Sequence, residues 1–234
     1  MPAGKHDRVL LIEANVGMIE PVQSSTVEWA VSRKTVQGRP QAPEQYVVKA
    51  TPSGFLIAIV DGMGHSPEAL TACQLAVEAL NEYTHQNVVT LFERCDRSCK
   101  RTSGVSITAA IFNTSYNTVS WFGVGNVEAV LWHRNPHSDP RYHLLVQQPG
   151  LIGHGLLSLK ELSLPVRAGD LLILASDGIK PGIVEALPIE GKSKIVADSL
   201  MHSHGRPDDD ATILVTRYLG GIVAGSSPPA QPAQ

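Results

Sequence analysis

Two apolar runs in this chain each lead into an Asp-Gly pair, and this pattern constrains the fold more than any other feature. Phe55 to Val60 is followed directly by Asp61, and Leu171 to Ala175 is followed two residues on by Asp177. A short apolar run bounded by glycine is typical of a buried strand. Each Asp is therefore expected at the mouth of a strand, where it is held rigidly and still reaches solvent.

A third acidic segment, Asp208 to Asp210, precedes the strand-like run 212–216. If carboxylates from the three segments converge, they repel one another strongly unless divalent cations neutralise them. Hard oxygen ligands of this kind suit Mg²⁺ or Mn²⁺. Asp-Gly is also a common turn signal, so the alternative is a set of ordinary turns without a metal. From the residues alone, both interpretations stay open.

Neighbouring residues suggest other sites, which the spacing supports less well. Gly62-Met-Gly64 resembles the start of a dinucleotide-binding loop, but that loop needs a third small residue where this chain has Pro67. We therefore reject a nucleotide site. His65 would either touch a phosphate or cap the turn. The pair in His202-Ser-His204 would either ligate a metal or be solvated.

The composition limits the functions open to the chain. With 234 residues, 43% hydrophobic content and a formal net charge of -3, it can bury one core and lacks the basic surface that nucleic-acid binding needs. No apolar run approaches the roughly 20 residues of a membrane span, and residues 1–8 lack the apolar core of a signal peptide. We expect a cytoplasmic protein with one domain, residues 1–219, and a disordered tail, residues 220–234.

Periodicity predicts blocks of strands and helices rather than strict alternation. Ser66 is a good N-cap and Pro67 suits the first helical position, so a helix should begin there. Further helices are predicted over residues 88–99, 183–187 and 192–202. Strands are predicted over residues 26–32, 46–48, 55–60, 105–112, 118–124, 129–133, 142–146, 171–174 and 211–216. Such blocks favour an α+β fold with antiparallel sheets over a doubly wound fold.

The three cysteines, Cys73, Cys95 and Cys99, show no disulfide-framework spacing. Cys95 and Cys99 could share one face of a helix, but a structural zinc site usually has four ligands, and no second Cys or His pair stands at a convincing spacing. We expect buried free thiols. No cysteine opens a glycine-rich anion loop, so a phosphocysteine intermediate is not expected.

Together, the acidic segments resemble the signature segments of the metal-dependent (type 2C, PPM) protein phosphatases, most closely their bacterial SpoIIE-like branch. The segments are Asp61-Gly-Met-Gly-His65, Ser176-Asp-Gly-Ile179 and Asp209-Asp-Ala-Thr212, and Gly123-Val-Gly-Asn126 matches that branch's central strand pair. Within the branch, the short single-domain chain is similar to the stressosome phosphatases. The resemblance implies an α-β-β-α sandwich of two antiparallel sheets flanked by helices, with two metal ions between the sheets.

By the same resemblance, Asp61 would bridge two Mn²⁺ or Mg²⁺ ions, and the Gly62 carbonyl would bind one of them. Asp177 and Asp209 would complete the shell of the other ion, which makes Asp61, Asp177 and Asp209 the expected catalytic ligands. Asp210 would lie behind the ligands. Water activated by the two ions would attack phosphorus in line and hydrolyse the phosphoester in one step.

The chain departs from the family at one ligand position. The family usually has an acidic residue, commonly in Gly-Asp, on the loop before the strand that precedes the Asp61 motif, and this chain has Pro43-Glu44 there. Glu44 keeps the charge but is one methylene longer, so it would bind a metal directly or through water. The alternative is that Glu44 is a solvated loop residue.

The resemblance implies a serine/threonine protein phosphatase that acts on phosphoserine or phosphothreonine in a regulatory partner. The expected partners are STAS-domain scaffold proteins of the stressosome, and neither nucleic acid nor a membrane is expected. One alternative is a phosphatase-fold binding module without useful catalysis, which the Glu44 departure favours and the three intact Asp residues oppose. Another is a different metallohydrolase, such as a phosphodiesterase.

Overall fold

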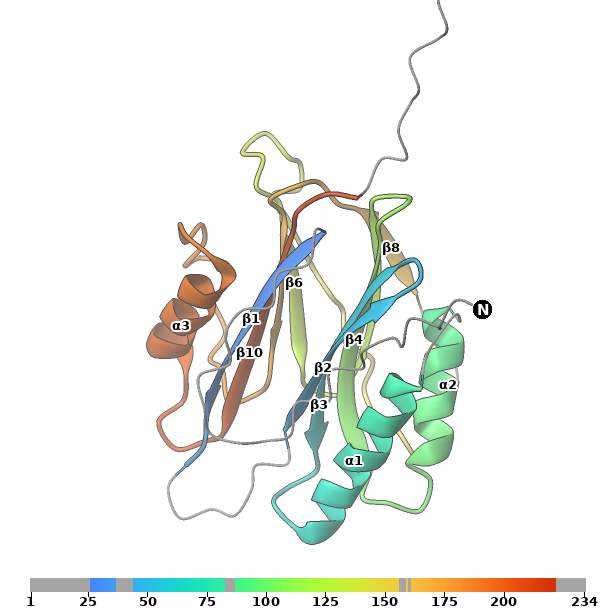
Figure 1. Ribbon diagram of the computed structural model, residues 1–234. Helices are drawn as coiled ribbons and strands as arrows, with labels where there is room; N and C mark the ends of the chain where they lie inside the picture. Colours follow the sequence, from blue (N-terminus) through green and yellow to red (C-terminus); the bar gives the residue numbers. More distant parts are fainter. Residues whose placement is uncertain (1–25, 37–43, 83–86, 156–158, 160, 222–234) are drawn as a thin grey trace, which may run out of the picture.

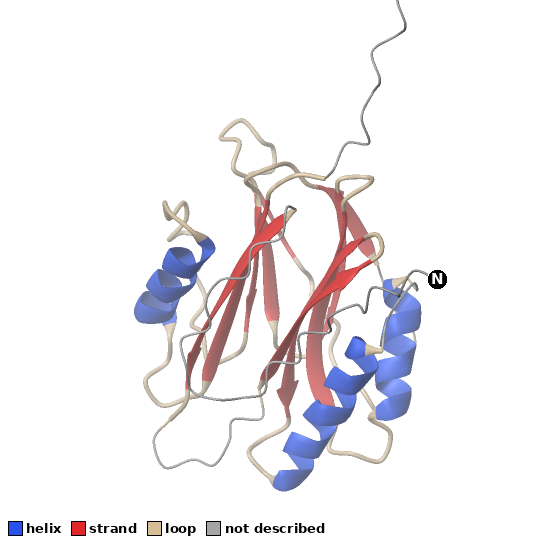
Figure 2. Cartoon of the chain, in the orientation of Figure 1, coloured by secondary structure: helices blue, strands red, loops and turns tan. Residues whose placement is uncertain are grey.

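Two antiparallel sheets form the centre of the molecule, and helices lie on both outer sides (Figures 1 and 2). The computed structural model describes residues 26–36, 44–82, 87–155, 159 and 161–221. The elements are β1 (Val27–Lys34), β2 (Gln45–Thr51), β3 (Gly54–Gly62), α1 (Pro67–Asn81), α2 (Val88–Ser98), β4 (Val105–Asn113), β5 (Thr118–Val124), β6 (Glu128–Trp132), β7 (Tyr142–Leu144), β8 (Leu162–Pro165), β9 (Leu171–Ala175), α3 (Ser193–His204) and β10 (Ala211–Tyr218).

The strands divide into two five-stranded sheets. Sheet A has the order β1-β10-β9-β6-β7 and sheet B the order β2-β3-β4-β5-β8, and neighbouring strands are antiparallel in both. Helices α1 and α2 cover the outer face of sheet B, and α3 covers the outer face of sheet A (Figure 1). The predicted α+β fold, an α-β-β-α sandwich of antiparallel sheets, is therefore confirmed.

Strand β3 shows why its sequence is a continuous apolar run. Leu56, Ala58 and Val60 pack in the layer under α1 and α2, whereas Ile57 and Ile59 pack in the layer between the two sheets. All five are fully buried, and burying one large aliphatic side chain stabilises a fold by about 1.5–3 kcal/mol. Packing on both faces therefore fixes the strand that carries Asp61.

The helix predictions are confirmed at three places and wrong at one. α1 begins as expected, since Ser66 Oγ accepts a hydrogen bond from a backbone N–H of the first turn at 3.3 Å and Pro67 opens the helix. Residues 183–187, predicted to be helical, form turns instead. Gly182 precedes this segment and Pro188 follows it, and five residues are too few to offset the cost of helix nucleation.

Two edge strands were hardest to predict: β8, which pairs with β5, and β7, which pairs with β6. β8 was missed, because Leu162 to Pro165 is mostly exposed and ends in proline, which is tolerated at a sheet edge. β7 ends at Leu144, two residues before the predicted end. Both strands lack the buried apolar runs that mark the central strands, so periodicity gave a weak signal there.

The described part of the chain ends at Gly221, whose N–H donates to Asn117 Oδ1 at 3.2 Å. Tyr218 donates its hydroxyl to the same oxygen at 2.7 Å. Contacts with the β4–β5 side of the molecule therefore continue two residues beyond the predicted boundary at residue 219. Residues 222–234 lie outside the described residues, so the disordered tail stays a prediction. Among the described helices, none combines the length and apolar character needed to cross a membrane.

Candidate metal centre

The acidic segments meet at one end of the sandwich because the strand register places them there. Asp61 is the penultimate residue of β3, and Glu44 directly precedes β2, the antiparallel neighbour of β3. In sheet A, Asp177 follows β9 and Asp209 precedes β10, again an antiparallel pair. In each sheet, an acid at the end of one strand thus lies beside an acid at the start of the neighbouring strand.

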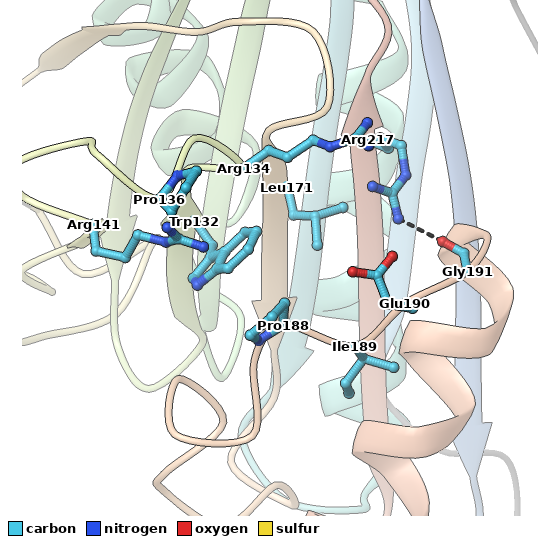
Figure 3. A pocket seen from close by; sticks show the side chains of 10 residues that line it. All are labelled: Trp132, Arg134, Pro136, Arg141, Leu171, Pro188, Ile189, Glu190, Gly191 and Arg217. Atoms are coloured by element: carbon cyan, nitrogen blue, oxygen red, sulfur yellow. Dashed lines mark hydrogen bonds between the residues drawn. The ribbon is translucent and has the colours of Figure 1, made fainter.

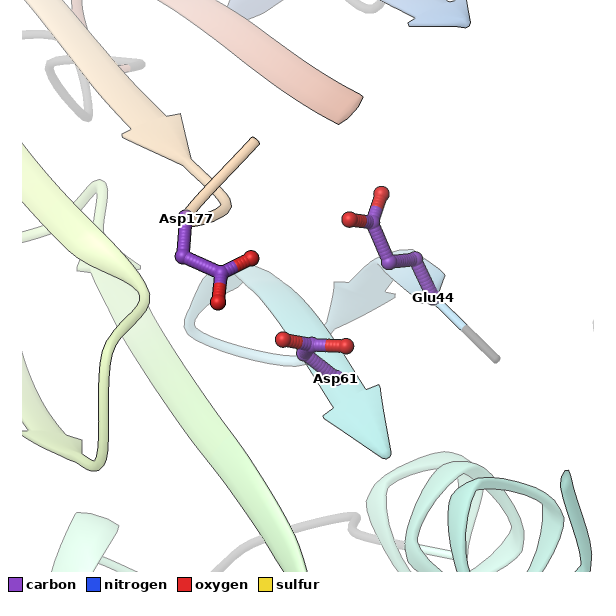
Figure 4. A group of neighbouring side chains, drawn as sticks. All are labelled: Glu44, Asp61 and Asp177. Carbon is purple, nitrogen blue, oxygen red and sulfur yellow. The ribbon is translucent and has the colours of Figure 1, made fainter. Parts of the chain in front are cut away.

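Carboxylate oxygens of Glu44, Asp61 and Asp177 lie within 4.8 Å of one another. Figure 4 shows the three side chains projecting from three separate segments into the same space. We call these three residues the acidic cluster. Glu44 is buried, Asp61 is half-buried and Asp177 is exposed. The cluster therefore opens to solvent on the Asp177 side, from which a cation can enter.

The electrostatics of Asp61 show that the acidic cluster is not balanced by the protein. The pKa of Asp61 is raised from 3.8 to about 8, first by burial and then by the carboxylates of Glu44, Asp177, Asp209 and Asp210. Without a cation, Asp61 is largely protonated at neutral pH. A divalent cation would favour the ionised carboxylates, and an oxygen-only donor set is the set that Mg²⁺ and Mn²⁺ prefer. The cluster therefore fits such an ion.

Asp209 does not belong to the group whose carboxylate oxygens lie within 4.8 Å of one another. Its charge nevertheless raises the pKa of both Asp61 and Asp177, although burial is the larger cause for each. Gly62, the other predicted ligand, is the last residue of β3 and directly follows Asp61. The structure brings Asp61 and Asp177 together, while ligand roles for Asp209 and Gly62 stay predictions.

Glu44 is a buried member of the site, which contradicts the alternative of a solvated loop residue. Its side chain is 4% exposed, and Glu44 Oε2 accepts a hydrogen bond from the hydroxyl of Thr212. Burial raises the pKa of Glu44, whereas hydrogen bonds with Thr212 and Ser176 oppose that rise. Arg33 donates to the Glu44 carbonyl at 2.6 Å. Glu44 is therefore held in place by both sheets.

Asp210 connects the loops around the acidic cluster. It is buried, its Oδ1 accepts the N–H of Val36 at 2.8 Å, and its Oδ2 lies 3.3 Å from His65 Nε2. The expected placement of Asp210 behind the metal ligands stays a prediction. His65 lies against a carboxylate, a partner that the sequence did not suggest. The contact joins the loop after β3 to the loop before β10.

Two further residues at the site were not predicted. Asn126 Nδ2 donates to Asp177 Oδ2 at 2.6 Å, and Arg206 Nε donates to the Asp177 carbonyl at 3.0 Å. The glycine before Asn126 was the available signal: Gly125 has a φ of +96°, and a Cβ there would come within 2.1 Å of Ser106 Oγ. The Gly-Asn turn thus places the Asn126 amide against Asp177.

The cysteines are buried and free, as predicted. Burial raises the pKa of Cys95 to about 12 and that of Cys99 to about 11, so neither is a reactive thiolate at neutral pH. Among the described residues, the group of side chains arranged to hold a metal ion is the acidic cluster. It contains neither His202 nor His204, and the metal-ligand alternative for these histidines has no support.

Comparison with known proteins gives one family. The model of the family Stage II sporulation protein E (SpoIIE) matches residues 51–193, more than half of the chain. The phosphoserine phosphatase RsbX of Bacillus subtilis (strain 168) is 22% identical over 199 residues, which cover 84% of this chain and 98% of RsbX. Most of the sandwich, including Asp61 and Asp177, lies within both matches.

Solved structures share the fold. RsbX in complex with magnesium has a TM-score of 0.78 at 19% identity, covering 86% of this chain and 100% of that chain. A chain from a structural description of the bacterial stressosome has a TM-score of 0.72 at 22% identity, with coverages of 82% and 99%. The catalytic domain of the phosphatase PstP with two manganese ions has a TM-score of 0.59 at 19% identity, with coverages of 83% and 99%.

Proposed function

The chain belongs to the SpoIIE family of metal-dependent (type 2C) protein phosphatases, and from that premise we propose that it hydrolyses phosphoserine or phosphothreonine on a regulatory partner protein. The observation that carries this proposal is the acidic cluster, whose carboxylate oxygens lie within 4.8 Å of one another. The raised pKa of Asp61, about 8, shows that the protein itself does not balance the cluster. A hydrolase that works through bound cations accounts for both features.

Two Mn²⁺ or Mg²⁺ ions fit the oxygen-only donor set. Asp61 would bridge them, the Gly62 carbonyl and Glu44 would serve one ion, and Asp177 and Asp209 would serve the other. When bound, such ions lower the pKa of water and neutralise charge on the phosphoryl oxygens. A water nucleophile also agrees with the three buried, unreactive thiols, which exclude the cysteine route among the residues described.

The neighbours of the acidic cluster orient the carboxylates. Thr212 donates to Glu44 and Asn126 donates to Asp177, so each carboxylate is fixed before a cation arrives. Fixed ligands reduce the reorganisation needed on binding, so removing such a supporting hydrogen bond should weaken metal binding. Thr212 and Asn126 would therefore act as positioning residues.

For the partner, we propose the phosphorylated STAS-domain proteins of a stressosome. Likeness to the phosphoserine phosphatase RsbX and to a chain described with the bacterial stressosome supports this choice. We place the reaction in the cytoplasm, since three free thiols fit a reducing compartment.

Hydrolysis of a phosphoserine peptide, measured as released phosphate, tests the activity. We expect turnover with added Mn²⁺ and none in excess EDTA, with p-nitrophenyl phosphate behaving in the same way. A chain that binds Mn²⁺ but releases no phosphate from either compound would instead be a phosphatase-fold binding module. Turnover that is unchanged in EDTA would contradict the metal-dependent proposal.

A further inference from the structure

A pocket of about 400 Å³ lies on the outer face of sheet A (Figure 3). Trp132, Leu171 and Arg217 come from β6, β9 and β10 and are paired side by side in the strand register. Trp132 and Leu171 belong to the apolar layer on the α3 side of the sheet. Leu171 begins β9 and Asp177 follows its other end, so roughly 13 Å or more of strand separates the two sites.

Three arginines converge on this pocket, and each is held by a group other than a carboxylate. The Arg141 guanidinium lies 4.4 Å from the centroid of the Trp132 ring, a cation–π contact. Arg217 donates through Nη2 to a backbone carbonyl of the loop before α3 at 2.7 Å. The stem of Arg134 lies over Gly169, where a Cβ would come within 2.4 Å of its Cδ. Contacts thus hold the guanidiniums of Arg141 and Arg217, and packing against Gly169 positions the stem of Arg134.

The positive charge of the pocket is compensated only in part. Glu190 is the single acid among the ten lining residues, so the lining carries a formal charge of +2. Within the described part of the chain, none of the three guanidiniums forms an ion pair with a carboxylate. Like charges held together cost free energy unless an anion lies between them. Guanidinium groups are also the side chains best shaped to bind phosphate through paired hydrogen bonds.

We propose that this arginine pocket binds a phosphate group carried by a segment of a partner protein. The pocket is larger than a phosphate group requires, and Trp132, Pro188 and Ile189 give it apolar walls that would contact residues flanking the phosphorylated side chain. Its one acid cannot assemble a two-cation centre, which distinguishes the pocket from the acidic cluster. It is a second site, which goes beyond the proposed function of the acidic cluster.

Trp132 provides a direct probe of binding. The chain has three tryptophans, and Trp29 and Trp121 lie in the layer between the sheets. The three indole N–H resonances of the ¹⁵N-labelled full-length chain, assigned with Trp132→Phe, would be followed in EDTA so that nothing is hydrolysed. We expect a phosphoserine peptide to shift the Trp132 resonance alone. The unphosphorylated peptide should give no shift, and inorganic phosphate should bind at least tenfold more weakly.

Charge variants test whether the arginines of the pocket, rather than arginines elsewhere on the surface, bind the phosphoserine peptide. The double variant Arg141→Gln/Arg217→Gln should bind the phosphoserine peptide more than tenfold more weakly, with an unchanged melting temperature. Arg97→Gln, which removes an exposed arginine of α2 on the other sheet, should bind like wild type. The inference is overturned if the Trp132 resonance does not move, if inorganic phosphate binds as tightly as the peptide, or if the double variant binds normally.

The same double variant keeps this inference distinct from the proposed function. Its Mn²⁺-dependent hydrolysis of p-nitrophenyl phosphate should equal that of wild type, because the acidic cluster is untouched. Loss of peptide binding with normal hydrolysis supports a second site. A double variant that loses hydrolysis of this small compound would show that the arginines belong to the catalytic machinery, and would overturn the inference.

Discussion

Two carboxylates at opposite ends of the sandwich, Asp170 and Asp61, have opposite surroundings. Asp170 is 3% exposed and accepts the backbone N–H groups of Arg134 and Arg167, each at 3.0 Å, while His133 Nδ1 lies 2.8 Å from its Oδ2. Asp61 lies among other carboxylates, and its pKa is raised to about 8. Hydrogen-bond donors satisfy the first acid, whereas the second needs cations. Burial alone therefore does not mark a functional acid; the neighbours do.

The largest expected effect is the loss of hydrolysis when Asp61 is replaced. Asp61→Asn should lower the rate of p-nitrophenyl phosphate hydrolysis to less than a tenth of the wild-type value, more than about 1.4 kcal/mol in the barrier. The melting temperature in EDTA should stay the same or rise, because the substitution relieves repulsion among the carboxylates. A variant that keeps more than a tenth of the rate would show that Asp61 does not bridge the cations.

Asp170→Asn should lower the stability of the fold and leave hydrolysis intact. Replacing the carboxylate by an amide removes the charge from the hydrogen bonds that Asp170 accepts from two backbone N–H groups and takes away one acceptor oxygen, at a cost of about 3 kcal/mol. For a chain of this size that corresponds to a fall in melting temperature on the order of 10 °C. The hydrolysis rate of the folded fraction at low temperature should be retained. If the melting temperature does not fall, Asp170 does not stabilise the fold in the way its contacts indicate.

The pH dependence of stability should sharpen the contrast. Because the pKa of Asp61 is about 8 in the folded chain and 3.8 in the unfolded reference, the folded state binds more protons between these values. Stability in EDTA should therefore fall as the pH rises from about 4 to about 8. The raised pKa values of Glu44 and Asp177 act in the same direction.

Thermal melts at several pH values measure this effect. Added Mn²⁺ should raise the melting temperature most at pH 8, where the ligands are deprotonated. Asp61→Asn should flatten the dependence of stability on pH in EDTA. An identical slope in Asp61→Asn and wild type would mean that Asp61 is not the group responsible.

The smallest effect concerns Glu44. Glu44→Gln keeps the length of the side chain and an oxygen that can accept the Thr212 hydrogen bond, but removes the charge. We expect the Mn²⁺ concentration for half-maximal hydrolysis to rise severalfold, because one ion loses a charged ligand while Asp61, Asp177 and Asp209 remain. Thr212→Val is the matched control, because it keeps the charge of Glu44 but removes the hydrogen-bond donor. It should raise the Mn²⁺ concentration for half-maximal hydrolysis less than Glu44→Gln does. Superimposable metal titrations of Glu44→Gln and wild type would exclude a ligand role.

The sequence predicted the central strands and the place of the acids well, because both depend on local patterns. A strand buried on two faces is a continuous apolar run, and the acid that follows it is read directly from the chain. Edge strand β8 was missed because it is mostly exposed. Residues 183–187 were wrongly predicted to be helical because a short apolar segment that packs on the core has the same pattern whether it forms a helix or turns.

The site contacts made between distant segments could not be predicted from local patterns. The hydrogen bonds from Thr212 to Glu44 and from Asn126 to Asp177 each cross more than 50 residues of sequence. Glu44 itself stands next to a loop rich in Gly, Pro and Gln, which suggested solvent exposure, and only the packing of the two sheets buries it. The family resemblance supplied the ligand pattern that local reasoning left undecided.

Anomalous diffraction from crystals grown with Mn²⁺ would locate the bound cations themselves. We expect two manganese peaks per chain at the acidic cluster, with Asp61 oxygens within about 2.0–2.3 Å of both, and we expect Asp61→Asn to lose at least one of them. Peaks elsewhere on the molecule would contradict this expectation. So would two unchanged peaks in the Asp61→Asn variant, because the bridging carboxylate would then not be what holds the ions.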